Sequence, residues 1–152
     1  MRTAACFLVF FLFSTGCAGL SFAQRHGVHA HTDVISQSQA EGVDYPALLQ
    51  QAADGDPDSL VRVFSLQGLN AAGSQSHAFF LWTVVREVGD EAAAAAYRRC
   101  NTAARIRFTD HLAFELGISE ETPDAAAARI ALAADPDFRR DFPALAAAIG
   151  HQ

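Results

Sequence analysis

The feature that most constrains this fold is a helix-start signal that occurs three times after Asp44. A capping residue, a proline and an acid follow one another in "DPD" from Asp56, in "TPD" from Thr122 and in "DPD" from Asp135. The cap oxygen accepts a bond from an unpaired amide, and proline has no amide hydrogen to lose at the first helical position. The acid then suits the positive end of the helix dipole. These signals predict a chain built from helices.

Helix ends are marked by glycine, the residue that most easily adopts the left-handed conformation closing a helix. The glycines at such places are Gly68, Gly89 and Gly117. Together with the start signals they predict helices over 45–54, 57–67, 71–88, 91–100, 102–116 and 123–134, then a pair after Asp135 that is broken at Pro143.

The connections between these segments are short, which favours antiparallel helical hairpins. We therefore predict an all-α domain over 43–150, a compact bundle or stack of antiparallel helical hairpins with about six to seven helices. The stretch "AFFLWTVV", 78–85, is apolar all round. A strand is the alternative there, but it would have no partner, so we expect a central helix. The predicted core is Phe79, Phe80, Leu81, Trp82, Val84, Val85 and Val88, surrounded by Leu60, Val63, Phe64, Ile106, Phe108, Leu112, Leu116, Ile130 and Leu132.

The first 23 residues resemble an export signal. Arg2 precedes ten uncharged apolar residues, 4–13, and small residues follow. That run is too short to span a bilayer alone. Cleavage after Ala23 would use the small residues Ser21 and Ala23. Alternatively, the stretch before Cys17 resembles a lipoprotein box, with Cys17 acylated and retained. An uncleaved anchor is the third possibility.

Residues 24–42 show neither a helical nor a strand periodicity and are rich in Gln, Ser and His. We expect a flexible tether. If cleavage follows Ala23, the amine of Gln24, two amides and the His26 imidazole could surround Cu(II) or Ni(II) in a square plane. His29 and His31 would be additional donors. The competing interpretation is a solvated linker whose histidines bind no metal.

The composition argues against nucleic acid as a partner. The chain carries 17 acids against 11 arginines, has no lysine and has a formal net charge of −6. Binding phosphates requires a dense basic face. The one basic concentration, Arg98, Arg99, Arg105 and Arg107, is expected to be a solvated helix face. Cys100 is the single thiol after the leader, so we predict no internal disulfide and a buried, inert Cys100.

Catalytic motifs are mostly absent from the sequence: there is no phosphate loop, no G-x-S-x-G and no H-E-x-x-H. The best candidate pair is His111 and Glu115, four residues apart on one predicted helix face. They could serve a small hydrolase or a metal-dependent enzyme, or they could simply belong to the polar face of an amphipathic helix.

We accordingly expect an exported, non-enzymatic binding or scaffolding protein. Its partner would be a protein, and the membrane would be contacted only through the leader or a lipid anchor. It would be periplasmic or secreted, or else a membrane-tethered lipoprotein. We expect no cofactor, with Cu or Ni as the alternative.

Overall fold

The computed structural model describes residues 20–118 and 124–151, and within these ranges it contains helices and no strand. The predicted all-α class is confirmed. Residues 1–19, which include Cys17 and most of the leader, lie outside the described residues, as do Thr122 and Pro123. The elements are α1 (Phe22–Arg25), the short 3-10 helix η1 (Val28–Ala30), α2 (Thr32–Ala40), α3 (Tyr45–Ala53), α4 (Pro57–Phe64), α5 (Ala71–Val88), α6 (Asp90–Arg99), α7 (Thr102–Glu115), α8 (Ala125–Ala134), α9 (Pro136–Asp141) and α10 (Pro143–Gly150). Among the described residues, no helix has the length and apolar character needed to cross a bilayer.

The predicted start signals act as caps where the structure describes them. The Asp56 carboxylate accepts a bond from the Ser59 amide at 2.7 Å, and Asp135 accepts one from the Phe138 amide at 2.7 Å. Each cap precedes a proline in the first turn, as the sequence predicts.

The stop signals are confirmed at two of three glycines. Gly89 has φ 80° directly after α5, and Gly117 has φ 73° just after α7. Gly68 also has positive φ, but α4 ends at Phe64, earlier than the predicted 57–67. Residues 65–68 are instead a loop that buries Leu66.

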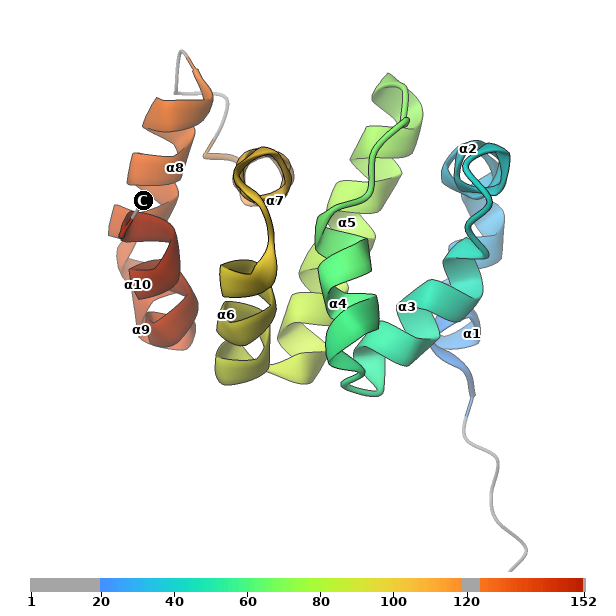
Figure 1. Ribbon diagram of the computed structural model, residues 1–152, viewed down its shortest axis with the longest axis horizontal. Helices are drawn as coiled ribbons and strands as arrows, with labels where there is room; N and C mark the ends of the chain where they lie inside the picture. The colour runs from blue at the N-terminus through green and yellow to red at the C-terminus, as the bar shows by residue number, and fades with distance from the viewer. Residues whose placement is uncertain (1–19, 119–123, 152) are drawn as a thin grey trace, which may run out of the picture.

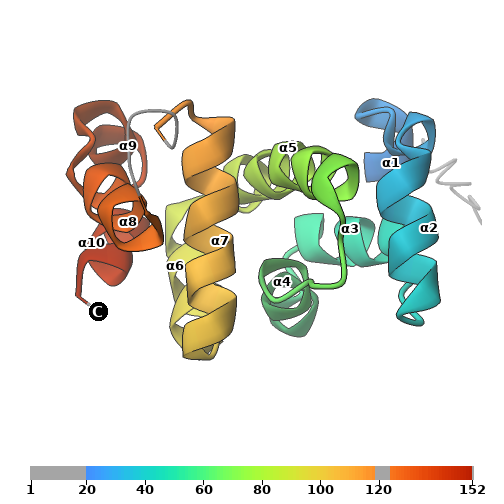
Figure 2. The same cartoon turned by 90° about the horizontal axis from the view of Figure 1, so that it is seen from above.

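The helices form a row along the long axis of the molecule, with α1 and α2 at one end and α8 to α10 at the other (Figure 1). The central element is α5, which contacts α2 and α3 on one side and α6 and α7 on the other (Figure 2). Simple hairpins of successive helices were expected, but α4 packs chiefly on α3 and α6, and α6 packs chiefly on α10 and α4. The packing of α4 on α6 joins helices two apart in the chain, and the packing of α6 on α10 joins helices four apart.

The core surrounds α5 as predicted, with exceptions at its edges. Phe80, Leu81, Val84 and Val85 are fully buried, and so are Phe108, Leu112 and Leu132. Trp82, Val88 and Leu116 are half-buried. The prediction was wrong for three residues that point to solvent: Phe79 is 42% exposed, Ile106 43% and Ile130 63%.

Alanines let α6 lie close to two neighbours. Ala93, Ala94 and Ala96 are buried where α6 packs on α4 and α10, since a methyl side chain permits close helix approach. At the start of α6, the two carboxylate oxygens of Asp90 accept bonds from the Ala144 and Leu145 amides, both at 2.8 Å. Asp90 thus caps α10, whose own N-cap residue Phe142 makes no side-chain cap bond.

Residues 24–42 differ from the predicted flexible tether, because they form α1, η1 and α2 packed on α3 and α5. Val28 and Val34 are fully buried, as is Phe22 just before them. Widely spaced apolar residues give no helical periodicity, so the sequence pattern missed them. The folded part begins by Phe22 and not at Val43.

We predict that Phe22→Ala lowers the free energy of unfolding by about 3–5 kcal/mol, because a fully buried ring leaves a cavity behind. Chemical denaturation followed by far-UV circular dichroism measures the change. Phe79→Ala is the matched control, since this ring is 42% exposed and its loss should cost much less. Equal effects of the two substitutions would contradict the placement of Phe22 in the core.

Candidate functional site

The three histidines of the proposed metal site face different partners. His26 Nε2 lies 2.6 Å from a Glu87 oxygen, and His31 Nδ1 lies 3.0 Å from Ser76 Oγ. His29 is exposed and lines a separate open cavity with Ile35. Within residues 20–118 and 124–151, no group of three or more His, Cys, Asp or Glu side chains is placed to hold a metal ion. His26 and His31 each contact a side chain of α5, whereas His29 is exposed.

A square-planar site at Gln24 would also compete with α1. The Arg25 amide donates to the Ser21 carbonyl at 2.9 Å, and the His26 amide donates to the Phe22 carbonyl at 3.0 Å. Those two amides would have to lose their protons to bind Cu(II) or Ni(II). The two accepting carbonyls belong to residues that cleavage after Ala23 removes, so α1 as described and the metal site belong to different forms of the chain.

A buried polar cluster lies where α3, α4, α5 and α7 meet. The Tyr45 hydroxyl lies 2.8 Å from His77 Nδ1, and the imidazole is also hydrogen bonded to the Val63 backbone. Because a carbonyl can only accept, the ring donates to Val63 and accepts from Tyr45 through Nδ1. Burial raises the pKa of Tyr45 and so keeps the phenol a donor. With Nδ1 bonded to Tyr45 and the ring buried, His77 fits a structural role.

The second imidazole of the cluster is His111, whose ring stands edge-on to His77 with centroids 5.1 Å apart. Burial and the Arg107 charge lower the pKa of His111, whereas desolvation raises the pKa of Glu115. Both side chains belong to the described part of α7, and no hydrogen bond joins them. None of the four main cavities of that part is lined by either residue.

Two members of the basic cluster bind helix ends. The Arg105 guanidinium donates to the Tyr97 and Arg98 carbonyls at the end of α6, and Arg107 donates to the Ser65 carbonyl after α4. Cations there complement unpaired carbonyls and the helix dipole. Cys100 is buried, its Sγ lies 3.4 Å from the Ala96 carbonyl, and burial raises the pKa of its thiol. A thiol held in that state is a poor nucleophile.

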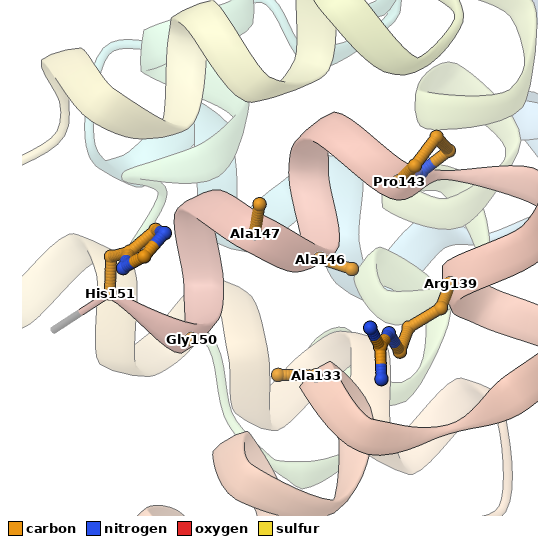
Figure 3. A pocket seen from close by; sticks show the side chains of 7 residues that line it. All are labelled: Ala133, Arg139, Pro143, Ala146, Ala147, Gly150 and His151. Carbon is orange, nitrogen blue, oxygen red and sulfur yellow. The ribbon is translucent and has the colours of Figure 1, made fainter.

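One cavity of about 400 Å³ lies between α8, α9 and α10 (Figure 3). Alanine methyls line it, and Arg139 and His151 stand on opposite sides of the alanines in that view. Arg139 belongs to α9, and His151 follows α10.

Of these four cavities in the described part of the chain, the most apolar lies between α7 and α8 and has a volume of about 390 Å³. From α7 it is lined by Thr102, Ile106 and Thr109, and from α8 by Ala125, Ala126 and Arg129. The Thr109 hydroxyl already donates to carbonyls of its own helix. Ile130 lies four residues after Ala126 and so extends the same face of α8. We call this surface the α7–α8 groove.

Sequence reasoning placed Ile106 and Ile130 in the core and therefore missed this groove. The signal that could have revealed it is the alanine-rich start of α8, which leaves space beside a larger residue on α7. The chain matches no protein-family model, no curated protein and no solved structure.

We predict that His77 makes stability depend on pH. Burial lowers the pKa of His77 to about 3 from 6.5. Below pH 6.5 the unfolded chain therefore binds a proton that the folded chain does not, and stability falls from about pH 6.5 toward pH 3. His77→Gln should reduce this slope by up to about 1.4 kcal/mol per pH unit.

Denaturant titrations at pH 4 to 7 measure the slope. His111 adds a smaller fall in the same direction, while the raised pKa values of Asp110 and Glu115 act in the opposite direction. His29→Gln is the control, since that side chain is exposed and should leave the slope unchanged. An unaltered slope in His77→Gln would show that His77 is not buried in its neutral form.

Proposed function

We propose that this protein is an exported, non-enzymatic binding or scaffolding module that holds a protein partner in the α7–α8 groove. The observation that carries the proposal is the pairing of an apolar groove with two exposed isoleucines, Ile106 and Ile130. Single exposed apolar side chains are normal, but contiguous ones beside a groove are typical of interaction sites. Fully burying one such side chain contributes about 1.5–3 kcal/mol.

The groove suits an apolar side chain from a partner helix. Its volume of about 390 Å³ lies at the lower end of the usual range for ligand sites, about 300–1,000 Å³. Its exposed surface is mostly apolar, and the Arg129 guanidinium, which also lines it, donates to the Ile149 carbonyl. Small alanines on one wall and isoleucine on the other leave room for a protruding leucine-like residue.

Charge favours a different protein over a second copy of this chain. The formal net charge is −6, so two copies repel each other at long range. A partner that is neutral or basic would not be repelled. We therefore assign the groove to another exported protein that presents an apolar helix face.

Crosslinking from within the groove tests the proposal. A photoreactive residue at position 106 of the exported protein should give an adduct with a discrete partner, identified by mass spectrometry. The same residue at position 79 is the matched control, because Phe79 is similarly exposed but lies outside the groove.

A second variant, Ile130→Glu, should abolish the adduct without unfolding the domain, since this side chain is 63% exposed. Circular dichroism checks that the fold is kept. The proposal fails if positions 106 and 79 give the same adducts, if the adduct at 106 is the chain itself, or if Ile130→Glu has no effect.

A further inference from the structure

The cavity beside Trp82 has an apolar wall built from three parts of the chain. Trp82 on α5, Leu116 and Ile118 after α7, and Phe138 on α9 form this wall, and the cavity has a volume of about 290 Å³. That volume lies just below the usual range for ligand sites, about 300–1,000 Å³. The cavity therefore has room for one small group, such as the end of a single side chain.

The indole in this wall is held by two other rings. The Trp82 ring centroid lies 6.4 Å from that of Phe138 and 5.2 Å from that of Phe142, and the Phe138 and Phe142 rings stack on each other at 5.7 Å. Trp82 is nevertheless only half-buried, so part of its surface stays accessible. Indole is the best aromatic partner for a cation. The cavity thus contains a positioned ring that a cation can contact.

The rest of the wall is acidic and consists of Asp135, Asp137 and Asp141. Asp135 accepts the Phe138 amide as the cap of α9. Arg140 donates to both oxygens of Asp141, at 2.8 and 3.2 Å, and to Asp137 at 2.7 Å. In the described part of the chain, these three carboxylates thus share one guanidinium, and a net negative charge remains. The Arg140 side chain is 67% exposed, and ion pairs of exposed side chains are weak.

We propose that this cavity, which we call the Trp82 pocket, binds the guanidinium group of an arginine side chain on the protein partner. The inference rests on the proposed function, since the partner is the protein held in the α7–α8 groove. Guanidinium is planar, stacks on aromatic faces and bonds carboxylates in a fork, whereas the ammonium of lysine is compact and strongly hydrated. Asp137 and Asp141 already hold one guanidinium together, so their spacing suits this group. The formal net charge of −6 also favours a basic partner.

One partner helix can reach both sites, because both border α7. Ile106 lines the groove, and Leu116, ten positions further along the chain, lines the Trp82 pocket. Ten residues of helix rise by about 15 Å, which is about three turns. The arginine of the partner would therefore lie about three turns from the apolar residue that enters the groove.

Titration of the purified protein with N-acetylarginine amide tests the pocket. Trp82 is the only tryptophan of the chain, so tryptophan fluorescence reports on a residue in the wall of this cavity. We expect a saturable change in emission. The citrulline derivative has nearly the same shape without the charge and should give no saturable change. The lysine derivative should bind more weakly than the arginine derivative.

Variants separate the pocket from the general charge of the protein. Asp137→Asn combined with Asp141→Asn should weaken binding of the arginine derivative by about tenfold or more, because the guanidinium loses two charged acceptors. Asp33→Asn combined with Glu91→Gln is the matched control. It removes the same charge from exposed acids outside the pocket and should leave binding unchanged.

The opposite change is expected at Arg140, which competes for the same carboxylates. Arg140→Gln should strengthen binding of the arginine derivative. Arg139→Gln is the matched control, because Arg139 lines the cavity of Figure 3 instead and its loss should have a smaller effect.

An unchanged emission, or equal binding of the arginine and citrulline derivatives, would overturn the pocket and leave the groove proposal intact. Equal binding of the lysine derivative would overturn the choice of guanidinium. If the Asp137 and Asp141 variant keeps the full adduct from position 106, the pocket does not serve that partner. Arginine binding without any adduct at position 106 would instead overturn the proposed function and keep the guanidinium site.

Discussion

The rest of the structure depends on one helix that must be covered on nearly every side. Along α5, Phe80, Leu81, Val84 and Val85 all have essentially no exposed surface. A helix that is apolar all round is stable in water only inside a shell of other elements. Here α2 and α3 supply one side of that shell and α6 and α7 the other. The row of helices seen in Figure 1 follows from the need to cover the apolar surface of α5 with helices on both sides.

The same demand explains why residues 22–40 fold. Phe80 is covered by the His31 ring, with centroids 4.9 Å apart, and by Tyr45 at 6.3 Å. Without the N-terminal segment, part of this face of α5 would meet solvent. Sequence reasoning recognised α5 as apolar on all sides but assigned it too few covering helices. The remaining cover of α5 comes from residues 22–40, whose sequence is mostly polar. Their helices are held in place by contacts with α3 and α5.

The sequence correctly predicted those helix ends whose stabilising contacts join residues close together in the chain. The cap at Asp56 and the glycine stop at Gly89 involve atoms within a few residues, so short motifs suffice to predict them. The capping of α10 by Asp90 joins residues 54 and 55 positions apart and exists only because α6 packs on α10. Likewise, Ile106 and Ile130 have core-like chemistry, and only the packing of α7 and α8 shows which faces remain in solvent. The histidines follow the same rule, because the bond between Tyr45 and the buried His77 joins residues 32 positions apart.

The α7–α8 groove lies toward the end of the row of helices that is opposite α1 (Figure 1). α7 packs on both α5 and α8, so one helix contributes both to the cover of the central helix and to the groove. The core holds α7 in place through Phe108 and Leu112, which are fully buried. A partner bound at the groove would therefore rest on a helix that is fixed by the packing around α5.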